Sequence, residues 1–379
     1  MRHHYLLPRP LAALAVTGAT ALGTLGAAAP ATAREPFVGP LNTVATIAST
    51  VPANGDVNPY GTVVVPSDEG LLHRNSILVS NFNNAANQQG TGTTLVQIAP
   101  DGSVSQFAQI DPNHLPGECP GGVGLTTALT VLPGGWVVVG SLPTTDGTAA
   151  TAQAGCLLVL DKHGTVRETL TGNGINGPWD MTSVSHHGTS ELFVTNVLND
   201  TVAGGGSVVP EGTVLRLTLK DRGDEPPCLE RSTVIGSGFD QRTDPAALVV
   251  GPTGVGLGHD GTLYVADTVN SRITAIPDAL RRHDSAGTGE LVTEGGSLNA
   301  PLGLAVAPRG EILTVNGGDG NLVETTPRGE QVAVRQLDSS GTPPNVGAGA
   351  LFGLAVDHDH DAVYFVDDAT NQLDVLRKP

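Results

Sequence analysis

The chain has 379 residues, of which 39% are hydrophobic, 15% are charged and 3% are aromatic. This composition excludes an intrinsically disordered chain, and the length is sufficient to bury a large core. The formal net charge of −18 argues against nucleic acid and anionic membranes as partners. Turns rich in the 50 glycines and 27 prolines separate short Val, Leu and Thr segments, which indicates an all-β protein.

The first 33 residues are typical of a secretory signal peptide. Arg2 and Arg9 give a basic start, an apolar run covers residues 11–29, and Ala31-Thr32-Ala33 fits a small-residue cleavage site. The alternative is a retained membrane anchor, because about 19 apolar residues just span a bilayer. The cleavage motif favours removal after Ala33, which takes two arginines and no acids and changes the formal charge from −18 to −20. We therefore expect a secreted, extracellular protein without membrane attachment.

The segment at residues 252–273, PTGVGLGHDGTLYVADTVNSRI, is the clearest copy of a repeated unit. It predicts a strand, a tight HDG turn, a second strand that ends in VAD, and the start of a third strand. The pattern returns near residue 301 as PLGLAVAPRGEILTVN and near residue 351 as LFGLAVDHDHDAVYFVD. Gly254, Gly303 and Gly353 are spaced by 49 and 50 residues. Such a period indicates a repeat architecture.

Six units follow one another along the chain, each with four strand candidates separated by turn signals. They cover residues 58–110, 123–170, 176–235, 245–294, 300–338 and 350 onward. Four-stranded units in tandem predict a six-bladed β-propeller over residues 34–379. The sixth unit stops one strand short, whereas an orphan alternating strand, LNTVATIAS, precedes the first unit at residues 41–49. We expect this N-terminal strand to complete the last blade and protect its edge.

The unit at residues 252–273 resembles the NHL-repeat family of six-bladed propellers. It carries that family's Pro-x-Gly strand, Asp-Gly turn, Tyr-Val-Ala-Asp strand end and Arg-Ile strand start, and the last two units match in part. The chain is more distantly similar to propeller lactonases of the SMP-30 and gluconolactonase type, which carry a metal-ligating glutamate at the start of an innermost strand. Here Asn58, Asn176 and Asn299 stand near such starts, and this departure puts a lactonase assignment in doubt.

The ends of the six second strands carry a column of short polar residues. That position faces the same end in every blade, so we expect the six side chains to ring one mouth of the central channel. Their oxygens suit a hard cation such as Ca²⁺, with Asp267 and Asp367 as metal ligands. The alternative, which a repeated residue favours, is that each side chain caps its own corner. We call this set the polar ring, and its members are Asn81, Ser141, Asn196, Asp267, Asn316 and Asp367.

Histidines and cysteines supply two further expectations. The run DHDHD at residues 357–361 has the residue types of a metal site, but it falls at a hairpin turn on the face opposite the polar ring, where a solvated turn is expected. Cys119 and Cys156 both adjoin connections on the ring face, whereas Cys228 lies in a loop of the third unit. In an oxidising compartment this predicts a Cys119–Cys156 disulfide and a free Cys228.

No motif of an activated nucleophile or a phosphate loop occurs in the sequence. The first hypothesis is therefore a secreted, monomeric binding module that takes a small molecule or an extracellular protein over the ring face. The alternative is an enzyme, namely a Ca²⁺-type metal-dependent hydrolase, lactonase or lyase that uses the Asp and Asn residues at the channel mouth. The sequence identifies no catalytic residue for it.

Overall fold

Twenty-five β-strands and two short 3₁₀ helices, η1 (Pro133–Gly135) and η2 (Ala149–Thr151), form the regular structure of the described residues. The computed structural model describes Met1 and residues 35–379. The predicted signal peptide and its cleavage site at Ala33 lie outside this range. In the described part, no helix is long and apolar enough to cross a membrane.

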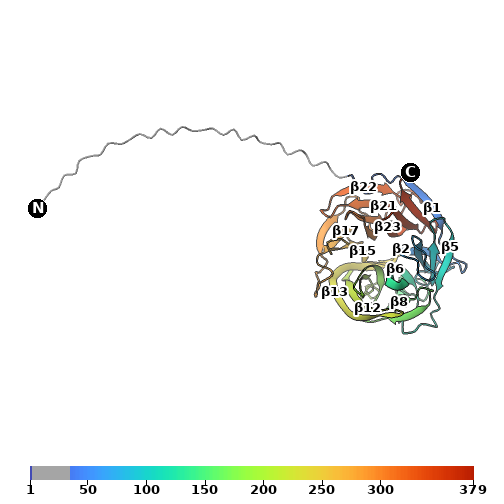
Figure 1. The fold of residues 1–379 in the computed structure, drawn as a ribbon. Helices are drawn as coiled ribbons and strands as arrows, with labels where there is room; N and C mark the ends of the chain where they lie inside the picture. The colour runs from blue at the N-terminus through green and yellow to red at the C-terminus, as the bar shows by residue number, and fades with distance from the viewer. Residues whose placement is uncertain (2–34) are drawn as a thin grey trace. The chain divides into compact units, whose positions relative to one another are not determined.

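The strands form six antiparallel sheets, the blades of a propeller, and every blade has an inner, a second, a third and an outer strand. Figure 1 shows β2, β6, β15 and β23 around the centre and β5, β13 and β22 at the periphery. The inner strands are β2 (Val57–Val64), β6 (Leu125–Leu132), β10 (Pro178–His186), β15 (Pro252–Leu257), β19 (Pro301–Val306) and β23 (Leu351–Asp357). The second strands are β3 (Ile77–Asn83), β7 (Trp136–Ser141), β11 (Thr189–Asn196), β16 (Leu263–Asp267), β20 (Ile312–Asn316) and β24 (Ala362–Asp367).

The outer half of each blade contains the remaining strands. The third strands are β4 (Thr94–Ile98), β8 (Cys156–Leu160), β12 (Val209–Arg222), β17 (Arg272–Ile276), β21 (Asn321–Thr325) and β25 (Gln372–Arg377). The outer strands are β5 (Val104–Gln109), β9 (Val166–Leu170), β13 (Glu225–Asp244), β18 (Glu290–Glu294), β22 (Gln331–Gln336) and β1 (Thr43–Ser49). Blade 3 carries an additional short strand, β14 (Leu248–Val250), beside β13.

Burial explains why the middle strands read as continuous apolar runs rather than as an alternating pattern. Each blade packs between two others, so both faces of its middle strands are covered. Every residue of β8, with the sequence CLLVL, is buried, as is every residue of β20. The outer β22 alternates between half-buried and exposed residues because it borders solvent. The all-β six-bladed propeller predicted from the repeat is confirmed.

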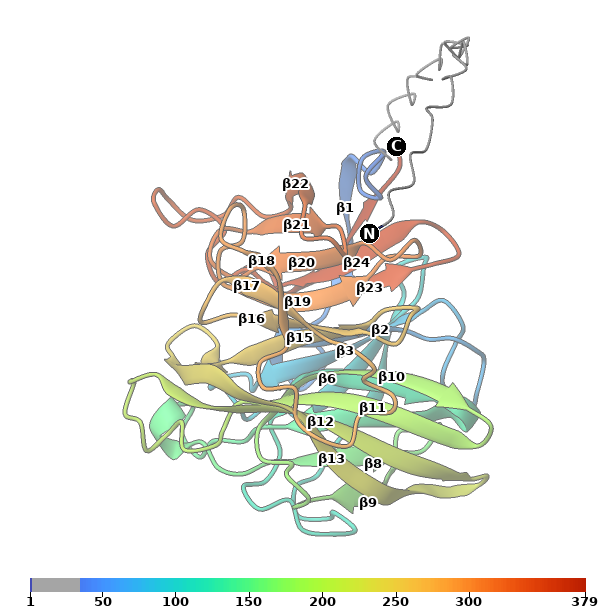
Figure 2. The same cartoon turned by 90° about the vertical axis from the view of Figure 1, so that its left-hand side faces the viewer.

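The N-terminal strand completes the last blade, as predicted. β1 pairs antiparallel with β25, from Thr43 opposite Arg377 to Ser49 opposite Gln372. Figures 1 and 2 show the blue β1 beside the red C-terminal strands. Closing the ring with both ends of the chain leaves β25 without a free edge.

The segment before β1 is held against blade 5 by two charged side chains. The backbone N–H groups of Phe37 and Val38 donate to the two carboxylate oxygens of Glu324 at 2.8 and 2.9 Å. Arg335 donates to the carbonyls of Val38 and Gly39 at 3.3 and 3.0 Å. The Phe37 and Val38 side chains are buried in the core between blades 5 and 6.

The repeated glycine of the inner strands permits neighbouring inner strands to approach closely. A Cβ added at Gly254 would overlap the backbone of Leu302 and Gly303, and one added at Gly353 would overlap the carbonyl of Tyr60. Gly303 meets the carbonyl of Phe352 in the same way. The glycine is therefore required by packing around the channel, and a different residue at this position marks a place where the inner strands are spaced differently.

Candidate functional site

The polar ring lies at the end of the second strands, as expected, but its side chains bond to the loops around them. All six are at most 4% exposed. Asn81 donates to the carbonyl of Thr50 at 3.0 Å, and Asn316 donates to that of Ser297 at 2.8 Å. Asn196 accepts from a backbone N–H at 3.0 Å, and Ser141 both accepts and donates. Each partner lies in the connection that enters the same blade, which is the capping arrangement considered from the sequence.

The two acids of the polar ring make different contacts. Asp267 accepts from Arg272 Nε at 2.7 Å and from the amide of Asn270 at 3.2 Å. Burial raises the pKa of Asp267, and the pairing with Arg272 opposes that increase. Asp367 accepts from the N–H of Thr370, and burial together with the nearby Asp338 raises its pKa to about 6. The two carboxylates thus serve separate corners, in blades 4 and 6.

Apolar side chains fill the channel at the ring end. Tyr60 stacks on Phe82 and on Phe352, with ring centroids 4.5 and 4.1 Å apart. Trp179 lies beside this stack and donates through Nε1 to the carbonyl of Val249 at 3.1 Å, which fixes β14 within the same buried cluster.

Metal binding at the ring end would require the oxygens of the polar ring to converge. Hard cations need several oxygen ligands around one point. The described residues contain no group of three or more His, Cys, Asp or Glu side chains placed to hold a metal ion. Metal ligation by Asp267 and Asp367 therefore stays a prediction, and we derive no chemistry from it.

A central cavity of about 540 Å³ lies along the inner strands and opens on the face opposite the polar ring. All six inner strands line it with their middle and C-terminal residues, and its mouth is formed by the turns that follow them. The walls combine aliphatic side chains, as at Val64, Leu129, Met181 and Val255, with polar groups such as Thr182, and polar atoms make up slightly more than half of the lining. None of the polar-ring residues lines this cavity.

Asp180 is the notable side chain of the cavity. It occupies, in β10, the position that Gly254, Gly303 and Gly353 occupy in the later blades. The other inner strands line the cavity only with residues that follow this position. Asp180 is therefore the lining residue nearest to the ring end of the channel, where the cavity is closed. Its carboxylate accepts from the N–H of Met181 at 2.8 Å and, across to blade 4, from the N–H of Val255 at 3.1 Å. It therefore bridges two inner strands that a glycine would bring together directly.

The protonation of Asp180 follows from its isolation. The residue is 8% exposed, and burial raises the pKa of its carboxyl to about 8 despite the two N–H donors. Among the described residues, no Lys, Arg or His forms an ion pair with it. At neutral pH the carboxyl is therefore mostly protonated and is able to donate or accept hydrogen bonds.

Charged residues of the first hairpin turns surround the mouth of the cavity. His358 and His259 both line it, and burial together with the neighbouring His259 lowers the pKa of His358. Arg74 pairs with Asp359 across the rim at 3.2 Å. The DHDHD turn expected to be solvated thus contributes to the entrance of the central cavity.

Asp180 was not singled out from the sequence, although a signal for it exists. Alignment of the inner strands places Gly61, Asp180 and the later glycines in one column, with Thr127 as the second exception. A repeat that departs from a sterically required glycine points to a local function or to a local change in packing. The location of the cavity carries no such signal, because it depends on which end of the channel the aromatic side chains fill.

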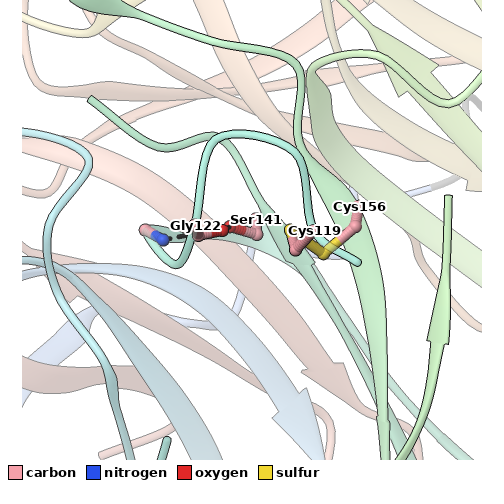
Figure 3. Close-up of a disulfide and its surroundings, with 5 residues drawn as sticks. Cys119, Gly122, Ser141 and Cys156 are labelled. Carbon is pink, nitrogen blue, oxygen red and sulfur yellow. Dashed lines mark hydrogen bonds between the residues drawn. A yellow bond between two sulfur atoms is a disulfide. The ribbon is translucent and has the colours of Figure 1, made fainter. Parts of the chain in front are cut away.

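The predicted disulfide is confirmed. Cys119 and Cys156 are joined with an S–S distance of 2.09 Å, and Cys228 is a free, half-buried cysteine. Cys228 lies within β13, opposite Lys220 of β12, rather than in the loop between them. Figure 3 shows the disulfide next to Ser141, whose hydroxyl donates to the carbonyl of Gly122. Cys156 pairs with Ser141 in the sheet, so the disulfide joins the connection that enters blade 2 to the strand beside this polar-ring residue.

Comparisons with known proteins identify the fold. No protein-family model and no curated protein matches the chain. A solved gluconolactonase from Xanthomonas campestris is 14% identical with a TM-score of 0.54, covering 94% of this chain and 99% of that one. The calcium-binding protein regucalcin from Agrobacterium tumefaciens is 14% identical with a TM-score of 0.52, covering 87% and 94%. A luciferin-regenerating enzyme is 11% identical with a TM-score of 0.53, covering 88% and 95%.

At these identities the similarity is one of fold. The chain is a six-bladed propeller that resembles the SMP-30 and gluconolactonase type. Membership of the NHL-repeat family stays a prediction, since no family model supports it.

Proposed function

We propose that this protein binds a small, largely apolar molecule in the central cavity, with Asp180 as the polar anchor. The observation that carries the proposal is a single buried carboxyl at the closed end of a cavity whose walls combine aliphatic side chains with polar groups. Concave, mostly apolar sites with few oriented polar groups are the usual form of small-molecule sites. This keeps the binding-module hypothesis but moves the site from the ring face to the opposite face.

The cavity is large enough for useful affinity. A ligand that buries about 200 Å² of apolar surface gains about 5 kcal/mol, before the loss of its translational and rotational freedom is subtracted. The inner strands that form the walls are central elements of six packed blades, so the site is largely formed before binding. A hydrogen bond to Asp180 then orients the ligand.

The enzymatic alternative has weaker support. The fold is shared with a gluconolactonase, which makes a hydrolase or lactonase compatible with the architecture. However, the described residues contain no group of three or more His, Cys, Asp or Glu side chains placed to hold a metal ion, and aromatic side chains occupy the ring end of the channel. In the cavity on the other face, Asp180 is the carboxyl at the closed end, and the remaining titratable lining residues lie in the turns at the mouth. Binding is therefore the function that the geometry supports best.

A cavity-filling variant tests the proposal. Thr182 lines the cavity, is half-buried, and its hydroxyl makes no hydrogen bond in the described structure. We expect N-phenyl-1-naphthylamine, an uncharged fluorescent probe of apolar sites, to bind the native protein and to bind Thr182→Phe at least tenfold more weakly. Thr165→Phe, the same change at an exposed turn of blade 2, is the matched control and should bind the probe normally. Equal binding by all three proteins, or no binding by the native protein, would refute the cavity as the site.

A further inference from the structure

Asp180 is the one charge-bearing residue of the cavity lining that does not lie at the mouth, among the described residues. The strands packed against β10 are β6, β7, β11 and β15, and of these only β11 carries an ionisable residue, Glu191. Glu191 is engaged by Thr218 at 2.8 Å and by Arg216 at 3.6 Å. On β10 itself, His186 lies at the exposed end of the strand.

The remaining ionisable groups near the cavity are at its mouth and are partly paired. Asp357 is buried beside His360, which contacts it at 2.8 Å, and Asp359 pairs with Arg74. The histidines His259 and His358 complete this rim. The protein therefore supplies no cation to the closed end of its own cavity.

A buried carboxyl without a cationic partner is stable only when it binds a proton or when a cation is brought to it. A ligand ammonium group meets that requirement, because its charge replaces the missing cationic partner. Its N–H groups can donate to the lone pairs of the Asp180 carboxylate that the N–H groups of Met181 and Val255 do not use. The net charge of the chain, −18, also favours the approach of cations and disfavours anions. A neutral hydrogen-bond acceptor is the competing ligand, because it would accept from the protonated acid.

We propose that the cavity selects primary amines with an apolar body, which bind as ammonium ions to the Asp180 carboxylate while the proton of Asp180 leaves to solvent. The inference rests on the proposed function, because it assigns a ligand class to that same cavity. No covalent bond changes in this step. The ammonium enters with its own proton, the carboxylic acid releases one proton, and an ion pair remains between the ligand nitrogen and a carboxylate oxygen.

Proton release makes the affinity depend on pH in a defined direction. Because the pKa of Asp180 is about 8, most molecules must lose a proton before the ion pair forms at lower pH. The affinity for an amine should thus rise nearly tenfold per pH unit below pH 7.5 and level off above pH 8. An uncharged molecule of the same shape should show no such increase.

Displacement of N-phenyl-1-naphthylamine by two ligands of equal shape tests the inference. Cyclohexylmethylamine and cyclohexylmethanol would be titrated against the native protein between pH 6.5 and 8.5. We expect the amine to bind at least tenfold more tightly than the alcohol at pH 8, with the tenfold slope described above. Calorimetry in two buffers of different ionisation enthalpy should report close to one proton released per amine bound at pH 6.5.

Two variants identify the titrating group. Asp180→Asn keeps the size of the side chain and should lose both the preference for the amine over the alcohol and the pH slope of amine binding. His358→Gln removes a rim charge that would also repel an amine at low pH, and it should retain the slope. If the slope instead disappears in His358→Gln and persists in Asp180→Asn, the inference is wrong.

The outcomes separate the two proposals. If Thr182→Phe weakens binding of the probe but the amine binds no more tightly than the alcohol, the ligand class is overturned and the cavity site stands. If Thr182→Phe leaves probe binding unchanged, the proposed function fails and the inference fails with it. The proton count in the native protein requires no variant, so misfolding of Asp180→Asn would not rescue the inference.

Discussion

Asp180 should make the protein less stable as the pH rises. The carboxyl has a pKa of about 8 in the folded state, against about 3.9 in an unfolded chain, so the folded state binds the proton more tightly. The contribution of this difference to the free energy of unfolding is fully present below about pH 4, declines as the pH rises, and is lost above about pH 8. Four pH units correspond to a change on the order of 5 kcal/mol.

Thermal unfolding of the native protein and of Asp180→Asn between pH 5 and pH 9 measures this contribution. We expect the Tm of the native protein to fall more steeply than that of the variant, and the variant to be the more stable of the two at pH 9. Asp367 and Asp368, whose pKa values burial raises to about 6 and about 7, remain in both proteins and therefore cancel in the comparison. Parallel curves would show that Asp180 is ionised or solvated in the folded protein.

At the scale of one strand and its corner, Asp267 should stabilise blade 4 without a metal. Its carboxylate is completely buried and joins the end of β16 to Arg272 at the start of β17. Removal leaves Arg272 without its partner. Breaking a buried pair in this way typically costs about 3–5 kcal/mol, and the partial exposure of Arg272 reduces that cost.

We expect Asp267→Ala to lower the Tm by several degrees equally in EDTA and in millimolar CaCl₂, as measured by calorimetry. The matched variant Asp284→Ala removes an exposed acid of the same blade and should have a smaller effect. A loss of stability that occurs only in the presence of calcium would instead support the metal hypothesis for the polar ring.

Elements of the fold that depend on short stretches of sequence could be predicted, and elements that depend on packing between blades could not. The middle strands, the turns and the closing strand follow from apolar runs, glycine turns and a missing strand, all of which are local in sequence. The Cys119–Cys156 bridge followed from topology once the blades were counted. The aromatic filling of the channel did not follow from the sequence, because whether Tyr60 and Phe352 fill the channel or pack between blades depends on side-chain packing from several blades. The position of the cavity is a consequence of that packing and could not be predicted from the sequence for the same reason.

For the molecule as a whole, the critical element is the N-terminal segment that closes the ring. β1 supplies the fourth strand of blade 6, and Phe37, Val38 and Leu41 are buried against blades 5 and 6. Full burial of three such side chains contributes about 5–9 kcal/mol, which is comparable to the entire stability of a typical domain. The loss of β1 would also leave the edge of β25 open to pairing with another chain.

A mature chain that begins at residue 50 should therefore unfold or associate at concentrations where a chain that begins at residue 34 is a folded monomer. Size-exclusion chromatography with light scattering and thermal unfolding would compare the two. A synthetic peptide of residues 34–50 should restore the Tm of the shortened chain, because it can occupy the same edge and place Phe37 N–H and Val38 N–H on Glu324. The same peptide with Phe37→Ala and Val38→Ala should restore less, since it keeps the strand pairing but loses apolar burial. If the shortened chain melts as the longer one does, the stability of the propeller comes from packing between blades, and closure by β1 contributes little to it.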